Sequence, residues 1–542
     1  MAPKSVTSKT RISLSSILSS TLLIILLKGA TFFVSFKFSR VVKPDILGIV
    51  STFDLLCQIA MSLVVEPIRT YSFRAQLYRS SSPHETRETH GKLIMLSGIL
   101  FVPVLSLWYA VLRPKVPSEL QSPLIDVPYF LSCVFNILDN PLYILSQTKN
   151  HRFLASLSEA LSHFIGQIFI SLQATGESTD FVVISQARLL EAFLSFILLL
   201  SLLMFTFSRK NPSKSTTDKP NTALTASSLL PLFSSGLGIN MTELRTIISD
   251  SYARSALNFS FDTMTSKLLT FEQQGVLSQA KRILALIASM VFAPAERRVF
   301  EELSKVAHST SQKGNRQKDL FTQTTRLLRA SFYVGFLFFP FLTAISPEVA
   351  LVVFGRQWMD TTDVVQLQTL SFASMSLMPV NGIVEAVVRA TMQTASLTKN
   401  NIIMTIQSVV MLPVTFWLGT KYHSVGFILS TIISMASRIV IAFGVLWANS
   451  RLFGCSGKRL VQNSVPNFKI VSIVALISVI LLSLRTSIVQ EQFVLSYSDY
   501  LLDQTNTIRF IFAACVLGIL YLASIVLFDR ELYSIIRGRT PL

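Results

Sequence analysis

The chain has 542 residues, of which 50% are hydrophobic and only 14% charged, and its mean hydropathy is +0.53. A soluble protein of this size could not bury so much apolar side chain, so the composition predicts a membrane protein and excludes a separate soluble domain. The net charge of +18 comes from cations that flank apolar stretches, a pattern that disfavours nucleic-acid binding.

About fourteen apolar stretches of the length that crosses a bilayer follow one another along the chain. They lie near residues 14–36, 46–68, 92–112, 124–146, 153–174, 181–207, 250–271, 277–299, 327–346, 367–395, 400–419, 424–448, 469–487 and 508–528. The stretch 250–271 is the weakest because charged residues interrupt it. The fold class that we expect is therefore all-α, a polytopic bundle of about fourteen transmembrane helices.

A polar segment rich in Ser and Thr divides the first six apolar stretches from the rest. We expect a six-helix lobe over 1–207, a polar cytoplasmic linker over 208–246, a second six-helix lobe over 247–450, and two additional helices with a cytoplasmic tail over 451–542. Lys and Arg concentrate in the N-terminus, in alternate loops and in the tail, with the loop 297–329 the most basic. This bias predicts that both termini lie in the cytoplasm.

Recurring polar motifs predict that the two lobes are internal repeats. The fourth stretch holds Asn136 and Asn140 and the tenth holds Asn381 and Glu385, each pair on one helical face. The segments 181–185 and 426–430 are separated by the same number of residues as those two pairs. The end of the second stretch, with Glu66 and Arg69, similarly matches the end of the eighth, with Glu296.

Basic residues inside apolar stretches are the strongest functional signal. Lys28 interrupts the first stretch, with Lys37 and Arg40 further along, and a cation at the bilayer centre costs about 2.5–3.5 kcal/mol. Lys28 is satisfied either by a polar cavity between the lobes or by an ion pair with Asp54 or Glu66. Lys37 and Arg40 either bind a ligand there or extend to the membrane surface.

The remaining polar residues within the stretches also have two readings. Glu66 and Arg69 form a local salt bridge or a gate, and the polar pairs of the fourth and tenth stretches hold helices together or face the cavity. Arg254 adds positive charge to the seventh stretch, and Arg438 is either functional or tightly paired. An excess of cations over carboxylates favours an anionic, phosphate-bearing ligand.

Signals for enzymatic chemistry are absent from the sequence. It contains no phosphate-binding P-loop, no HExxH or GxSxG motif and no CxxC spacing, so we expect neither a catalytic role nor a metal or other cofactor. His163 is expected to be a paired core histidine rather than a proton carrier. Two pairs of aspartates, 360 with 363 and 499 with 503, lie in loops between apolar stretches, and we do not expect them to form a sugar-phosphate site.

Several motifs together resemble the Rft-type oligosaccharide translocation family, within the multidrug/oligosaccharidyl-lipid/polysaccharide exporter superfamily. They are Ser424 to Leu429 with Arg438, Asn381-Gly382 with Glu385, Gln274 to Val276, Phe292 with Pro294 and Glu296, Asp45 with Gly48, Glu66 with Arg69, and Pro141 with Ser146-Gln147. The chain departs from the family pattern at Ala256 to Asp262, where an acidic motif is usual, and at Val65 and Ser289, where arginines are usual.

The resemblance implies a function and a substrate. It implies that a dolichol-pyrophosphate-linked oligosaccharide moves from the cytoplasmic to the lumenal leaflet of the endoplasmic reticulum membrane, in support of N-glycosylation by other membrane proteins of that pathway. The expected substrate-binding residues are Lys28, Lys37, Arg40, Glu66, Arg69, Asn136, Asn140, Arg254, Glu296, Asn381, Glu385 and Arg438. The alternatives are an ion-coupled exporter of another amphiphile and a non-transporting accessory protein of the same pathway.

Overall fold

The computed structural model describes about two thirds of the chain, and nearly all of that part is helical, with no β-strand in it. The described residues are 23, 26–31, 33–35, 38, 40–55, 58, 123–148, 152–174, 180–209, 260–307, 313–354, 358, 364–392, 394–490 and 504–528. The predicted stretch 92–112 and the candidate residues Lys37, Glu66, Arg69 and Arg254 lie outside them.

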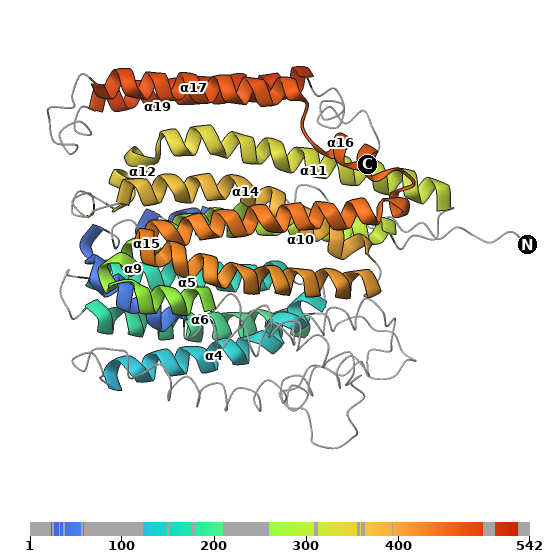
Figure 1. Ribbon diagram of the computed structural model, residues 1–542. Coiled ribbons are helices and arrows are strands. Elements are labelled where there is room, and N and C mark those ends of the chain that lie inside the picture. The colour runs from blue at the N-terminus through green and yellow to red at the C-terminus, as the bar shows by residue number, and fades with distance from the viewer. Residues whose placement is uncertain are drawn as a thin grey trace, which may run out of the picture. The chain divides into compact units, whose positions relative to one another are not determined.

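The helices follow the predicted order (Figure 1). They are α4 (Pro123–Thr148), α5 (Arg152–Gln173), α6 (Asp180–Arg209), α9 (Phe271–Ile287), α10 (Ala293–Ala307), α11 (Lys313–Ala344), α12 (Ser346–Phe354), α14 (Val364–Thr391), α15 (Thr394–Ala448), α16 (Gly457–Ser464), α17 (Phe468–Gln490) and α19 (Gln504–Phe528). A π-helical turn at Ala288–Phe292 joins α9 to α10, and a 3-10 turn at Ser450–Phe453 precedes α16. Residues 44–55 and 260–268 are also helical.

Six helices in the described residues are long and apolar enough to cross a membrane, which makes the protein a multi-pass membrane protein. They are Phe153–Gln173, Asp180–Thr206, Gly314–Ala344, Val364–Thr391, Ser396–Ala448 and Gly457–Leu484, the last of which combines the short α16 with the apolar α17 across a break at 465–467. The all-helical fold class is confirmed, and the count of fourteen transmembrane helices stays a prediction. The span Ser396–Ala448 contains a kink at His423 (φ 49°, ψ −129°), between the two stretches that the sequence separates there.

The sequence separates the stretches 250–271 and 277–299, and the structure breaks the helix there, although α9 begins at Phe271 and not at 277. Thr270 lies between the preceding helix and α9 and caps α9. Its hydroxyl accepts a hydrogen bond from the Gln273 amide, and the Gln273 side chain accepts one from the Thr270 amide. The short helices α12 and α16 were not expected, since neither is long enough to read as a span.

The chain divides into two compact units, which we describe separately. Unit 1 comprises residues 1–42 and 53–255, and unit 2 comprises 43–52 and 256–542.

Unit 1 is built on close contacts of α6 with α4 and α5. At one end an aromatic cluster is almost fully buried, with the Phe53 ring 5.0 Å from that of Tyr129 and 5.3 Å from that of Phe181. Further along α4 and α6, Leu142 and Leu199 form a second apolar contact. Edge-on and offset ring contacts add to the apolar burial that holds these helices together.

Two hydrophobic cores lie in the described residues of unit 2. In the first, α10, α11, α14 and the second half of α15 pack around aliphatic side chains such as Leu303, Leu328 and Val384. In the second, α17 and α19 lie side by side and pack against α11 (Figure 1). There the buried Tyr521 hydroxyl donates a hydrogen bond of 2.9 Å to the Tyr333 carbonyl oxygen of α11.

Candidate functional site

The two described cations of this region, Lys28 and Arg40, lie in unit 1. Lys28 is half-buried within the helical residues 26–31, and no hydrogen bond or ion pair joins it to another described side chain. Arg40 is exposed. The described contacts of Asp54 are with Arg188, so the proposed Lys28–Asp54 pair is not what the structure forms.

The polar pairs of the fourth and tenth stretches lie in the middle of helices and not at their ends. On α4, Asn136 is half-buried and Asn140 is buried. On α14, Asn381 is half-buried and its Oδ1 has no hydrogen-bond partner among the described residues. Glu385 forms an ion pair of 2.7 Å with Arg389, one turn further along α14.

Two other candidates of unit 2 are also placed. Glu296 lies in the first turn of α10 and against Gly382 of α14, so closely that a Cβ on Gly382 would stand 1.7 Å from its Oε1. The structure thus joins two motifs that the sequence singled out separately. Arg438 is half-buried in the second half of α15, and its Nε makes no hydrogen bond within the described part of the chain.

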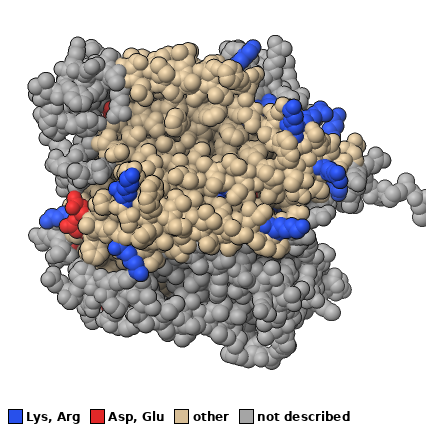
Figure 2. All heavy atoms as spheres, viewed as in Figure 1, with Lys and Arg blue, Asp and Glu red and all other residues tan. Residues whose placement is uncertain are grey.

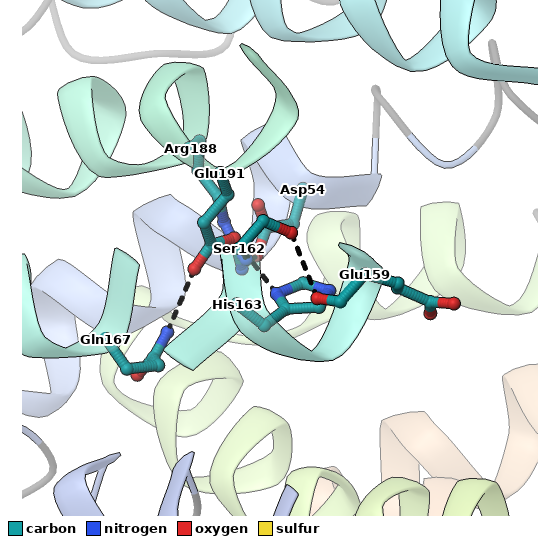
Figure 3. A network of polar contacts seen from close by, with 7 residues as sticks. All are labelled: Asp54, Glu159, Ser162, His163, Gln167, Arg188 and Glu191. Carbon is teal, nitrogen blue, oxygen red and sulfur yellow. Dashed lines mark hydrogen bonds and ion pairs between the residues drawn. The ribbon is translucent and has the colours of Figure 1, made fainter. Parts of the chain in front are cut away.

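The largest charged network in the described residues centres on Arg188 of α6 (Figure 3). Its Nη2 lies 2.5 Å from Oδ2 of Asp54, in the helix 44–55, and its Nη1 lies 3.1 Å from Oε2 of Glu191. The exposed fractions of the three side chains are 31% for Arg188, 25% for Asp54 and 6% for Glu191. One guanidinium therefore serves two carboxylates that are largely removed from solvent, the fork geometry for which Arg is suited.

Glu191 continues the network to α5 (Figure 3). Its Oε2 lies 3.2 Å from Nδ1 of His163, and its Oε1 accepts a 3.4 Å hydrogen bond from Nε2 of Gln167. Gly166 makes this approach possible, since a Cβ there would stand 2.2 Å from Cγ of Glu191. His163 is paired as expected, but its side chain is 50% exposed and so is not a core residue.

Helical spacing explains how these side chains meet. On α6, Arg188, Glu191 and Ser195 are three and four residues apart and share a face, and His163 and Gln167 do the same on α5. Ser195 extends the polar face to α4 through a 3.4 Å hydrogen bond to Asp139. Next to Asp54, Phe53 packs into the buried aromatic cluster and fixes the helix that carries the carboxylate.

The charge balance of the network limits its chemistry. Asp54 and Glu191 supply two carboxylates against one guanidinium, so the cluster is neutral only when His163 carries a second ring proton. Such a cluster ties three helices together and does not itself offer a surplus cation to a phosphate. No group of three or more His, Cys, Asp or Glu side chains in the described residues is arranged to hold a metal ion.

Sequence reasoning missed Arg188 and Glu191. The available signal was their spacing with Ser195 on the sixth stretch, opposite His163 and Gln167 on the fifth. Neither stretch alone showed that the charges would pair.

Comparison with known proteins shows which family the sequence matches. The sequence model described as "Rft protein" matches residues 12–538. A Caenorhabditis elegans protein named "Man(5)GlcNAc(2)-PP-dolichol translocation protein RFT1" is 23% identical over 428 residues, 76% of this chain and 79% of its own length. A Kluyveromyces lactis protein of the same name is 23% identical over 494 residues, 84% of this chain and 86% of its own length.

Solved structures agree on the fold. The inward closed conformation of the lipid II flippase MurJ superposes with a TM-score of 0.59 at 14% identity, covering 95% of this chain and all of that one. An inward-facing multidrug resistance MATE family transporter of the MOP superfamily gives a TM-score of 0.53 at 15% identity, covering 82% of this chain and 96% of that one. The fold is therefore that of MurJ and MATE transporters, and the chain, matched by the family model over nearly its whole length, belongs to the Rft protein family.

Proposed function

We propose that this protein moves a dolichol-pyrophosphate-linked oligosaccharide from the cytoplasmic to the lumenal leaflet of the endoplasmic reticulum membrane, in support of N-glycosylation. The observation that carries the proposal is the Rft family match over residues 12–538, together with relatives named for translocation of Man(5)GlcNAc(2)-PP-dolichol. The fold shared with a lipid flippase is compatible with this task. The protein acts as a translocator and not as an enzyme, and it uses no cofactor.

The pyrophosphate is held by Lys28 of the first stretch and by Lys37 and Arg40 just beyond it, with Arg254 contributing. Lys28 supports this role because its ammonium group is half-buried in an apolar helix and has no ion-pair partner among the described side chains. An unneutralised cation in such a position is costly and gains most from a phosphate-bearing ligand.

The ion pairs of unit 1 leave Lys28 available for that role. Asp54, the described carboxylate that could have neutralised Lys28, is engaged by Arg188 at 2.5 Å. The network of Arg188, Glu191 and His163 has a structural role in this proposal, holding α5 and α6 to the helix 44–55.

The polar pairs of the fourth and tenth stretches bind the sugar. Asn136 and Asn140 lie on α4, and Asn381 and Glu385 lie on α14. Asn381 supports this role, since its Oδ1 has no hydrogen-bond partner among the described residues and can accept a bond from a ligand hydroxyl. Glu66, Arg69, Glu296 and Arg438 complete the proposed binding set, and the dolichol chain stays in the lipid.

The architecture proposed for this activity is that of the sequence analysis. Fourteen transmembrane helices form two six-helix lobes, 1–207 and 247–450, joined by the linker 208–246, and two further helices follow in 451–542. Both termini are cytoplasmic. The lobes work by alternating access, so that the cation site opens to one leaflet at a time.

Reconstitution tests the proposal. The purified full chain is placed in vesicles with a fluorescent dolichyl-pyrophosphate heptasaccharide, and the labelled lipid that becomes accessible on the opposite leaflet is followed with time. We expect a rate that rises with the amount of protein and is lower for a dolichyl-monophosphate sugar, which has fewer phosphate oxygens for the cations. A rate equal to that of empty vesicles would refute translocation and favour the accessory role.

A further inference from the structure

A basic surface lies at one end of unit 2, around the short helix α16. Arg451, Lys458, Arg459 and Lys469 are all exposed there. Figure 2 shows Lys and Arg side chains gathered at the end of this face where Figure 1 labels α16. We call the surface formed by these four residues the α16 platform.

Carboxylates that could neutralise the α16 platform are scarce. The sequence contains no Asp or Glu between residues 386 and 490, a segment that holds all four of its cations. On α10, Glu302 already forms an ion pair of 3.0 Å with Arg298. On α11, Asp319 is exposed and has the cations Arg316 and Lys318 close to it in the sequence. Positive charge therefore exceeds negative charge at this end of the unit.

The helix α16 is anchored so that its basic face points outward. Leu460 is 1% exposed and packs into the first core of unit 2, whereas Lys458 and Arg459 are exposed. Arg459 lies over the Phe321 ring of α11 at 5.8 Å, and Arg329 of α11 donates a 2.7 Å hydrogen bond to the Asn463 carbonyl oxygen. These contacts hold the platform in one orientation.

The preceding turn is also fixed to α11. Gln317 donates a 3.1 Å hydrogen bond to the Arg451 carbonyl oxygen, and Gly454 follows in the left-handed region (φ 64°) with the Gln317 side chain 3.3 Å from the place of a Cβ. Since the cations stand on a fixed turn and a fixed helix, little backbone freedom remains to be lost when they bind a ligand.

Exposed apolar side chains border the basic face. Trp447 lies in the last turn of α15 and is 51% exposed, Val465 follows α16 and is 42% exposed, and Phe468 begins α17 and is 81% exposed. Each belongs to, or directly adjoins, a helix that crosses the membrane. A polar helix with Lys and Arg on one face and aromatic residues at its borders is typical of a segment that lies in the headgroup layer.

From this arrangement we infer that the α16 platform binds the headgroups of anionic membrane phospholipids. The cations contact the lipid phosphate and carboxylate oxygens, while Phe468 and Trp447 enter the acyl region beside them. The Lys and Arg bias of the sequence predicts that this end faces the cytoplasm, the leaflet that is rich in anionic lipid. This binding is separate from the proposed translocation and would operate without it.

The test measures lipid binding and not transport. The full-length protein in neutral detergent is titrated with a phosphatidylserine that carries a fluorophore on its acyl chain, and in parallel with the matching phosphatidylcholine. We expect tighter binding of phosphatidylserine, and a weakening of about tenfold or more in K458Q/R459Q, since each cation near a membrane surface contributes to attraction of anionic lipid.

Two control variants separate charge from fold and from position. The swap K458R/R459K keeps both charges and should bind phosphatidylserine as the unchanged protein does. The variant K267Q/K421Q removes two exposed cations from the other end of the spans, beside the kink at His423, and should leave binding unchanged. Thermal unfolding in neutral detergent checks that each variant is folded.

Three results would overturn the inference. They are equal affinity for phosphatidylserine and phosphatidylcholine, an equal loss in K458Q/R459Q and K267Q/K421Q, and stronger competition by a polyprenyl pyrophosphate or by inorganic pyrophosphate than by unlabelled phosphatidylserine. The last would assign the platform to the phosphate of a transport substrate. Since no step of the assay requires leaflet exchange, failure here and failure of the proposed function are distinguishable.

Discussion

Arg188 contacts two carboxylates through separate nitrogens, so replacing it by glutamine removes the positive charge from a network that keeps both negative charges. Breaking a buried pair by removing one partner costs about 3–5 kcal/mol, because the remaining charge stays buried and unpaired. Glu191 is 6% exposed and Asp54 is 25% exposed. Since Asp54 keeps some contact with solvent, we expect the lower end of that range, about 3 kcal/mol, for R188Q.

The assay measures the free energy of unfolding of the full chain in detergent micelles. A matched control is R298Q, which removes the same charge from the exposed Arg298–Glu302 pair and should change stability by less than about 0.5 kcal/mol. The triple variant D54N/R188Q/E191Q leaves no unpaired charge in the network and should recover at least half of the loss. A loss in R188Q no larger than in R298Q, or a triple variant less stable than R188Q, would refute the reasoning.

Two further substitutions test a close helix contact and a buried hydrogen bond. Gly166→Ala places a Cβ 2.2 Å from Cγ of Glu191 and should destabilise the protein by about 1–3 kcal/mol in the same unfolding assay. The control Gly29→Ala meets nothing within 4 Å and should be neutral or slightly stabilising. Equal effects of the two substitutions would contradict the close approach of α5 and α6. Tyr521→Phe removes the hydroxyl that donates to the Tyr333 carbonyl oxygen and should cost about 0.5–1.5 kcal/mol, and an unchanged unfolding free energy would argue against that bond.

Long apolar helices were the part of the fold that the sequence predicted well. The expected stretches 124–146, 153–174, 181–207 and 469–487 coincide with α4, α5, α6 and α17 within a few residues. The reason is that a bilayer sets the length of a helix and requires apolar side chains along it. The polar helix α16 has neither signal, since its position depends on contacts with α11.

The boundary at Thr270 was visible in the sequence as a Thr with a Gln three residues later, which is a helix-capping pattern. The prediction ended one stretch at 271 but began the next at 277, because the first turn of α9 holds polar residues that an apolar pattern does not mark. The capping pattern gives the start at Phe271 directly.

The charged network was not predictable in the same way. Asp54 and Arg188 are 134 residues apart in the chain, so nothing local shows that they pair. The sequence also left Lys28 with Asp54 as one of two possible partners. That alternative could be decided only by packing, because Gly166 and the aromatic cluster around Phe53 determine which side chains reach one another.

The central claim, that cations of the first stretch bind the pyrophosphate during translocation, is tested by initial rates of leaflet exchange in reconstituted vesicles. The comparison is between the unchanged protein, K28Q/R40Q and the control K267Q/K421Q, each at the same protein-to-lipid ratio and with folding checked by thermal unfolding. We predict a rate about tenfold or more lower for K28Q/R40Q, as expected for lost hydrogen bonds to a charged group, and an unchanged rate for the control. Equal rates for all three proteins would contradict the claim.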